Sequence, residues 1–177
     1  MQKDENNYNV KEYVETLSPK SFEQICVEYL KQLKGDQYSI RGTSFIKDGG
    51  KDITGKPVNG VPYEIWAECK KHTRSIGLED ISKNVVLVMS YGVNELIFFS
   101  TSNITETAKT HISKVASKHD FSVGFYYGDK LYKALESLPI FSKKISVKNN
   151  EKINIETHLS KYKNPEMYEK NDIIKLT

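Results

Sequence analysis

The order of strand-like and helix-like patterns constrains the fold of this chain more than any other feature. Apolar residues first repeat at helical spacing after Ser18 and Pro19, a helix-start signal, until Gly35 ends the pattern. A hairpin connection at residues 57–60 then precedes a strand at residues 61–70. Helices and strands alternate beyond this strand. This order predicts an α/β fold, with a mixed central sheet flanked by helices on both faces.

The remaining elements are predicted from apolar periodicity and turn residues. We expect a strand over residues 37–46, a tight turn over residues 48–52 that leads into or out of a strand, a helix over residues 78–91, a buried strand over residues 95–100, a strand over residues 121–127 and a short helix over residues 129–137. One more helix lies between the last two strands. Asn103, followed by Glu106, has the capping pattern that predicts its start.

The length of 177 residues suits one compact domain plus some extra chain. We predict that this domain covers residues 18–138. Residues 1–17 are polar and are interpreted as an N-terminal extension that either frays or forms a short helix. Residues 139–177 are rich in Lys and Asn, with little periodicity. They are interpreted as a linker or the start of a following domain.

Charge and hydropathy set limits on the partners. The formal net charge is +3, but basic and acidic residues balance up to residue 138, so global charge does not identify a ligand. No apolar run approaches the roughly 20 residues of a membrane helix, and the polar start lacks the apolar segment of a secretory signal. We therefore expect a cytoplasmic protein that does not contact a membrane. Cys26 and Cys69 lie in apolar patterns, which predicts reduced core thiols.

The chemistry is predicted from the strand at residues 61–70. Glu68 and Lys70 share one face of it, and a hairpin can bring Asp52 beside Glu68. Two carboxylates and a backbone carbonyl, here that of Cys69, suit Mg²⁺, for which Mn²⁺ substitutes. Lys70 can then orient or deprotonate an attacking water. Acidic and basic residues also alternate on solvent-facing strands, but a charged pair on a buried central strand is costly unless something binds it.

Polar residues after two of the predicted strands are candidates for contacts with nucleic acid. Lys71, His72 and Arg74 follow one strand. With Lys70 they form the densest basic cluster near the proposed chemistry. Ser100 and Thr101 lie at the end of another strand, where hydroxyls can contact a phosphate. The alternatives are a solvated loop for the basic cluster and a capping role for the two hydroxyls.

From residue 18 to residue 138 the chain resembles the Mrr-like branch of the PD-(D/E)XK nucleases, which have a restriction-endonuclease-like core. The matching segments are Phe22-Glu23, Asp48-Gly49-Gly50-Lys51-Asp52-Ile53, Trp66-Ala67-Glu68-Cys69-Lys70-Lys71 and Phe99-Ser100-Thr101-Ser102. The resemblance implies cleavage of double-stranded DNA with magnesium, with Asp52 and Glu68 as metal ligands and Lys70 as the activating residue.

The resemblance also adds a fourth site residue and contains one departure. In the family an acidic residue of the first helix often joins the site, and this position maps onto Glu23. A surface helix residue is the alternative for Glu23, because its neighbours Gln24 and Glu28 are also polar. Many Mrr-like members carry Gln where this chain has Glu68. The acidic form is the commoner one in the wider superfamily, so activity is still expected.

The main hypothesis is a metal-dependent endodeoxyribonuclease that serves as the effector domain of a bacterial restriction or antiviral defence protein. Cutting two strands with one site per chain implies a homo-oligomer at the moment of cleavage. The alternative from another class is a catalytically inactive nuclease-fold domain that binds nucleic acid or a partner. A junction resolvase or an RNA-directed nuclease shares the chemistry and differs in substrate.

Overall fold

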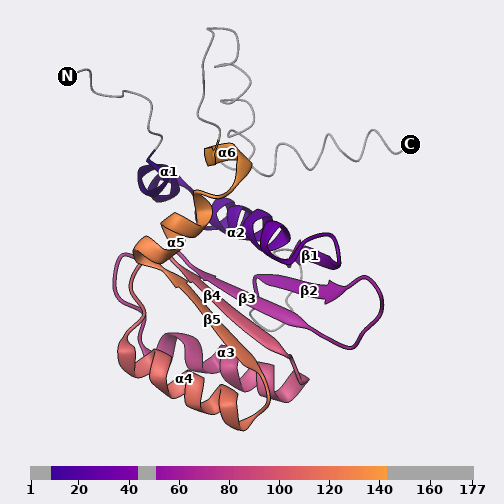
Figure 1. The fold of residues 1–177 in the computed structure, drawn as a ribbon. Coiled ribbons are helices and arrows are strands. Elements are labelled where there is room, and N and C mark those ends of the chain that lie inside the picture. Colours follow the sequence, from indigo (N-terminus) through magenta and orange to yellow (C-terminus); the bar gives the residue numbers. More distant parts are fainter. Residues whose placement is uncertain (1–8, 44–50, 143–177) are drawn as a thin grey trace, which may run out of the picture.

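The computed structural model describes residues 9–43 and 51–142, and Figure 1 shows the arrangement of their helices and strands. The elements are α1 (Val10–Thr16), α2 (Pro19–Lys34), β1 (Tyr38–Gly42), β2 (Ile53–Pro57), β3 (Ile65–Lys70), α3 (Leu78–Tyr91), β4 (Glu95–Ser100), α4 (Glu106–Lys118), β5 (Ser122–Tyr127), α5 (Gly128–Leu135) and α6 (Pro139–Ser142). The end of the first predicted strand and most of the predicted turn before Asp52 lie outside the described residues.

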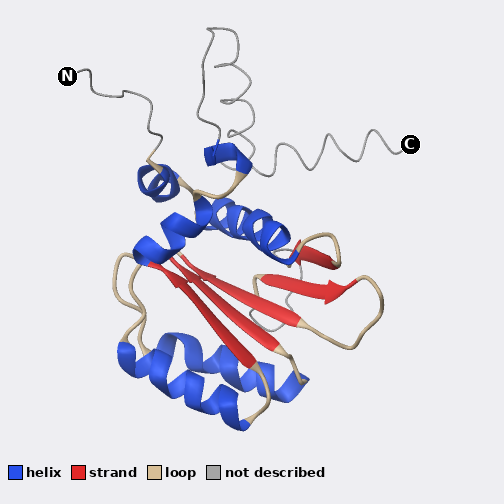
Figure 2. Ribbon diagram, in the orientation of Figure 1, coloured by secondary structure: helices blue, strands red, loops and turns tan. Residues whose placement is uncertain are grey.

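The five strands form one sheet in the order β1-β2-β3-β4-β5 (Figure 2). β1, β2 and β3 pair antiparallel, whereas β3, β4 and β5 pair parallel. Parallel neighbours need a crossover connection, and α3 and α4 supply the two that this sheet requires. The mixed sheet confirms the predicted α/β fold class.

Helices cover both faces of the sheet. α1, α2, α5 and α6 lie on one face, and α3 and α4 lie on the other (Figure 1). Each face has its own hydrophobic cluster, and β4 contributes to both, with Phe98 in the cluster of α3 and α4 and Phe99 in the cluster of α2 and α5. Both rings are at most 1% exposed. Burial of such a side chain contributes about 1.5 to 3 kcal/mol, so β4 is the apolar centre of the fold.

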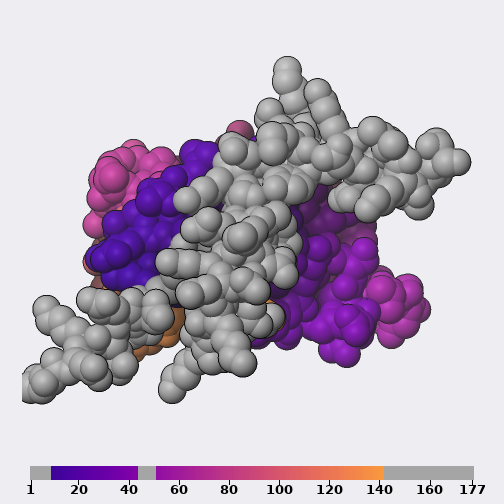
Figure 3. All heavy atoms as spheres, turned by 90° about the horizontal axis from the view of Figure 1, so that it is seen from above, coloured from indigo at the N-terminus to yellow at the C-terminus, as the bar shows by residue number. Residues whose placement is uncertain are grey.

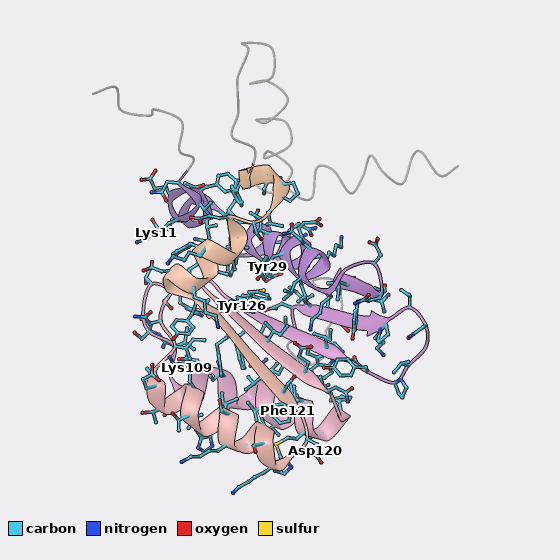
Figure 4. All side chains as sticks on the ribbon, in the orientation of Figure 1. Lys11, Tyr29, Lys109, Asp120, Phe121 and Tyr126 are labelled. Atoms are coloured by element: carbon cyan, nitrogen blue, oxygen red, sulfur yellow. The ribbon has the colours of Figure 1, made fainter. Side chains whose placement is uncertain are left out.

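Apolar packing holds the N-terminal helices on the sheet. Val10, Tyr13 and Val14 of α1 are buried in the same cluster as α2. Tyr29 of α2 packs edge-on against Tyr126 of β5, with ring centroids 5.4 Å apart (Figure 4). In the view from above, the N-terminal helices lie at the left in indigo and the first strands lie at the right in purple (Figure 3). α1 and α2 are therefore part of the core structure.

The start and stop signals of the first long helix act as the sequence predicts. The Ser18 hydroxyl oxygen accepts a hydrogen bond from the backbone N–H of Ser21 at 3.1 Å, and Pro19 occupies the first turn of α2. Gly35 ends α2 with a φ of 69°, a conformation that favours glycine. Within residues 9–43 and 51–142, no helix combines the length and the apolar character that crossing a membrane requires.

The start of α4 corrects the capping prediction at Asn103. The structure has Thr105 as the N-cap, with its hydroxyl oxygen accepting a backbone N–H of the first turn at 3.3 Å. Ile104 is buried and forms an isolated parallel bridge with Ile76. Because this long-range pairing keeps the backbone extended through Ile104, the helix begins two residues later than a cap at Asn103 allows.

β3 is shorter than the predicted strand over residues 61–70. It begins at Ile65, which pairs with Gly55 of β2. Val61 and Pro62 are exposed and belong to the hairpin connection, where proline has no backbone N–H to give to a sheet. A Cβ at Gly55 would lie 2.3 Å from Cδ1 of Ile40, so a larger residue there would require the Ile40 side chain to move.

Candidate active site

The end of the sheet at which β3 finishes brings three predicted site residues together. β2 runs antiparallel to β3, so the start of β2 lies beside the end of β3. Asp52 directly precedes β2, and its backbone N–H donates to the carbonyl of Ala67 at 3.0 Å. Glu68 and Lys70 follow Ala67 on β3. Two antiparallel strands thus carry all three side chains to one end of the sheet.

The Asp52 carboxylate is anchored on the backbone of β3. Its Oδ2 accepts a hydrogen bond from the backbone N–H of Cys69 at 2.7 Å, which places the carboxylate at the residue between Glu68 and Lys70. The Asp52 carbonyl accepts a hydrogen bond from the N–H of Thr43 at 2.9 Å. In the part of the chain that the structure describes, Oδ1 has no hydrogen-bond partner. This oxygen is an acceptor that a cation or a water can use.

The Glu68 carboxylate is held by two donors and is 6% exposed. The Lys70 ammonium donates to Oε1, and the side-chain amide of Asn84 on α3 donates to Oε2 at 2.8 Å. Glu68 and Lys70 are two residues apart on β3, so they lie on the same face of the sheet. The predicted pair of charges is therefore in direct contact.

Burial and neighbouring charge raise the pKa values of these carboxyl groups. The pKa of Glu68 rises from 4.5 to about 7, first because of burial and then because of the Asp52 charge, against the lowering effect of Lys70. Burial also raises the pKa of Asp52, and the hydrogen bond from Cys69 N–H and the charge of Lys70 oppose this shift. The two acidic groups therefore interact unfavourably when both are ionised.

Glu23 on α2 belongs electrostatically to the same cluster. Its pKa rises from 4.5 to about 7 because of burial, the Asp52 charge and the Glu68 charge, in that order, and Lys20 opposes the rise. Such influence requires proximity, because charges interact weakly across long distances in a protein. The structure thus brings the fourth predicted residue into the field of the other carboxyl groups.

Cys69 lies between the site and the core. Its side chain packs with the cluster of α2, opposite to the face of Glu68, and its backbone carbonyl is the predicted third metal ligand. Burial raises the pKa of the Cys69 thiol, and a hydrogen bond with the thiol of Cys26 adds to this shift. Both cysteines are free in the structure, as the sequence predicts for core thiols.

The donor set fits a hard divalent cation. The pKa values of the Glu23, Asp52 and Glu68 carboxyl groups are raised, so their ionised forms are unfavourable in the structure. A bound cation would stabilise these ionised forms. Each carboxylate oxygen has two lone pairs, so a hydrogen-bonded Glu68 can still bind a metal. Among the described residues, no three His, Cys, Asp or Glu side chains form a ready-made metal cluster. Mg²⁺ needs only one or two carboxylates, because waters complete its coordination.

Three predicted DNA-binding residues line one cleft at the end of the sheet where β3 finishes. Lys71, His72 and Thr101 border a cleft of about 610 Å³, which lies between α1, α5 and the loops after β3 and β4. The Lys71 ammonium donates to a backbone carbonyl of α1 at 3.1 Å, and the Thr101 hydroxyl donates to the carbonyl of His72 at 3.0 Å. The cleft therefore lies at the end of the sheet where β3 finishes, and Asp52, Glu68 and Lys70 are not among the residues that line it.

The other two predicted DNA-binding residues make contacts within the fold. The Arg74 guanidinium donates to both carboxylate oxygens of Asp80 at 2.9 and 2.6 Å, at the start of α3. Ser100 is 1% exposed, and its hydroxyl oxygen accepts a hydrogen bond from the N–H of Ser102 at 3.2 Å. Neither residue lines the cleft. The structure therefore separates Arg74 and Ser100 from Lys71, His72 and Thr101.

The sequence analysis missed Asn84 as a partner of the site. Asn84 lies on the buried side of α3 together with Ile81, Val85 and Val88. A polar residue within an apolar helical stripe was the available signal, because burying an amide is unfavourable unless it is hydrogen-bonded. The partner itself, Glu68, could not be predicted from helical spacing.

Comparisons with known proteins agree with this fold. The Mrr_cat family model, whose description is "Restriction endonuclease", matches residues 14–135. The solved structure of "DNA modification-dependent restriction endonuclease AspBHI" is similar, with a TM-score of 0.58 and 13% sequence identity over 92% of this chain. This chain spans 41% of the length of that protein, and at such identity the similarity shows the fold. No curated protein sequence matches. The family match covers more than half of the chain, so the protein belongs to the Mrr_cat restriction endonuclease family, which confirms the predicted resemblance.

Proposed function

We propose that this chain is a metal-dependent endodeoxyribonuclease that hydrolyses phosphodiester bonds of double-stranded DNA. One observation carries the proposal: the Asp52 carboxylate rests on the N–H of Cys69, between Glu68 and its bonded partner Lys70. Membership of a restriction endonuclease family supports nuclease chemistry at this cluster.

Asp52, Glu68 and the backbone carbonyl of Cys69 would hold Mg²⁺, with Mn²⁺ as a substitute. The bound cation supplies a nucleophilic water at neutral pH and neutralises negative charge on the phosphate. The buried carboxylates contribute to its binding, because a cation stabilises the ionised forms that burial and then the Asp52 charge disfavour, as the raised pKa of Glu68 indicates.

Lys70 stabilises charge during the reaction, and Glu23 accepts a proton. The Lys70 ammonium, already at the Glu68 carboxylate, orients the attacking water and offsets charge that develops on the phosphate oxygens. Glu23 has a pKa of about 7, so its carboxyl group can accept a proton at neutral pH. The two side chains come from β3 and α2, the elements that border the cluster.

The DNA backbone contacts the cleft at the end of the sheet where β3 finishes, which is the end that also carries Glu68 and Lys70. Lys71 supplies positive charge, and His72 and Thr101 supply further polar contacts. Arg74 joins them by exchanging its Asp80 partner for a phosphate, because its side chain is 64% exposed. Ser100 acts by shaping the loop that carries Thr101.

The biological role we propose is restriction or antiviral defence in the bacterial cytoplasm, with this chain as the effector domain. The similar protein AspBHI is named as a DNA modification-dependent restriction endonuclease, which supports such a setting. One carboxylate cluster per chain can cut one strand at a time. Cleavage of both strands therefore requires a homo-oligomer.

Cleavage of supercoiled plasmid tests the proposal. With Mg²⁺ or Mn²⁺ the protein is expected to give nicked and linear DNA, and Asp52→Ala and Lys70→Ala are expected to give neither while remaining folded by circular dichroism. Equal cutting by wild type and both variants would remove the assignment of this site.

The same assay separates the competing hypotheses when its substrates are varied. Cleavage of branched DNA or RNA in preference to duplex DNA favours a junction resolvase or an RNA-directed nuclease. A gel shift with tight DNA binding, and no cleavage under any divalent metal, favours an inactive nuclease-fold domain.

A further inference from the structure

Asn84 is a polar side chain in a place that favours apolar ones. It lies on the stripe of α3 that faces the sheet, and its burial matches that of its neighbours Ile81, Val85 and Val88. An amide without a partner in such a position is unfavourable. The side chain is therefore explained by what it bonds.

One partner of Asn84 is the buried carboxylate of the candidate site. Its amide nitrogen donates to Oε2 of Glu68 at 2.8 Å, while Lys70 donates to Oε1. The terminal torsion of a glutamate side chain is soft, so a single contact leaves the carboxylate plane free to turn. Two donors, one at each oxygen, fix that plane. Lys70 comes from β3 and Asn84 from α3, so separate elements hold the two oxygens.

The two donors differ in charge, and only Lys70 has a second proposed role. Lys70 is also the residue proposed to act on the water and the phosphate, so its contact with Glu68 is interrupted when it does so. The amide of Asn84 is neutral, and it holds Glu68 without cancelling the negative charge that attracts a cation. A lysine or arginine at this position would also hold the carboxylate, but its positive charge would neutralise Glu68 and compete with a bound cation.

We propose that Asn84 is a positioning residue, which orients the Glu68 carboxylate toward a bound divalent cation. This inference rests on the metal site of the proposed function. Partners that hydrogen-bond a metal-binding side chain typically change metal affinity by 10- to 100-fold when they are removed. The amide of Asn84 is expected to have an effect in this range.

Binding of Mn²⁺ tests the role without any nucleic acid. The free Mn²⁺ in a titration of the whole chain is measured by electron paramagnetic resonance, for wild type and for Asn84→Leu, which keeps a similar size and has no donor. The variant is expected to bind Mn²⁺ 10- to 100-fold more weakly. Asn84→Ala, which suits a helix, serves as a second variant where the leucine does not fold, as judged by circular dichroism.

A matched control separates positioning from general destabilisation. Val88→Ala removes volume from the same buried stripe of α3, and Val88 makes no hydrogen bond to Glu68 through its apolar side chain. It is expected to lower the melting temperature and to leave Mn²⁺ affinity within twofold of wild type. An unchanged affinity in both Asn84 variants overturns the proposal, as does an equal loss in Val88→Ala.

The outcomes also distinguish this inference from the proposed function. A wild-type chain that binds Mn²⁺ but cuts no nucleic acid, with weaker binding in Asn84→Leu, supports the positioning role and removes the nuclease assignment. A wild-type chain that cuts DNA, with Mn²⁺ affinity unchanged in Asn84→Leu, keeps the assignment and removes the positioning role. A wild-type chain that binds no Mn²⁺ removes the positioning role.

Discussion

The two ends of the parallel strands hold carboxylates in different electrostatic settings, of which Glu95 is partly buried and Glu68 is buried. At the end where β4 begins, Glu95 accepts from the ammonium of Lys34 at 2.6 Å and from the hydroxyl of Tyr63 at 3.4 Å. At the end where β3 finishes, Glu68 contacts Lys70 but also lies in the field of Asp52. Both carboxylates have a cation as partner, but the second also has a like charge nearby.

This difference indicates which end is structural. A carboxylate satisfied by an internal ion pair needs no external ligand, and breaking the pair leaves a buried charge unpaired. Carboxyl groups whose pKa values are raised by burial, and for Glu68 and Glu23 also by neighbouring carboxylates, are unfavourable in their ionised forms, which a bound cation stabilises. We therefore assign Glu95 to the fold, and we propose that Asp52, Glu68 and Glu23 serve a ligand.

The largest expected effect is on cleavage and is confined to the β3 end. Lys70→Ala is predicted to slow plasmid cleavage by 10²- to 10³-fold, about 3 to 4 kcal/mol, because it removes a preorganised charge from the reacting phosphate. Single-turnover cleavage at saturating Mg²⁺ measures the loss. Glu95→Gln, at the other end of the sheet, is the control and is expected to cleave at the wild-type rate. A large loss in both variants would break the comparison.

The second effect is on stability and is confined to the Glu95 end. Glu95→Gln is predicted to lower the free energy of unfolding by about 2 kcal/mol, because the Lys34 ammonium, 21% exposed, loses its partner. Urea denaturation followed by circular dichroism measures this change. Replacing both partners, as in the double variant Lys34→Met with Glu95→Gln, is expected to be less harmful than the two single losses added together. Strict additivity contradicts a direct ion pair.

The third effect is a dependence of stability on pH at the β3 end. In the folded protein the pKa of Glu23 is raised from 4.5 to about 7, so the folded state binds more protons than the unfolded state between these values. Below pH 4.5 Glu23 therefore does not lower the free energy of unfolding. This free energy decreases as the pH rises from 4.5 to about 7. Glu23→Gln is predicted to remove this loss, on the order of 1 to 2 kcal/mol after solvent screening.

Thermal melting of metal-free wild type and Glu23→Gln from pH 4.5 to pH 8 measures the third effect. The variant is expected to gain on wild type between pH 4.5 and about pH 7, and to keep this advantage without further gain up to pH 8. Adding Mn²⁺ is expected to reduce the advantage, because the cation neutralises the cluster. Parallel pH profiles for the two proteins would show that Glu23 lies outside the cluster.

The two ends were not equally predictable from the sequence. The alternation along β3 was enough to place Glu68 and Lys70 on one face, because a strand has a fixed period of two. Glu95 lies in a short apolar run without a local signal for its partner, and Lys34 is 61 positions away. Long-range pairs of this kind depend on how the helices dock on the sheet, and helical or strand periodicity does not contain that information.

The same limit explains the other differences between expectation and structure. The order of elements followed from local patterns, and the structure confirms the mixed sheet. The helix start at Thr105 was missed because Ile104 pairs with Ile76, 28 positions earlier along the chain. Arg74 looked available as part of a basic run, but it pairs with Asp80 across a turn. The first difference comes from a contact between separate segments, and the second from an ion pair across a local turn.

The smallest expected effect tests whether the cleft belongs to the β3 end of the comparison. Lys71→Ala is predicted to weaken binding of duplex DNA by about 1 kcal/mol, roughly fivefold, and to reduce the slope of log affinity against log salt by about 0.9, because one phosphate contact is lost. Fluorescence anisotropy in an Asp52→Ala background measures both without cleavage. Lys56→Ala is the matched control at the far side of the hairpin, where the lysine pairs with Glu64 at 3.2 Å. An equal loss in both variants would mean that DNA responds to overall charge and not to the cleft, and the carboxylate end would then have no binding surface of its own.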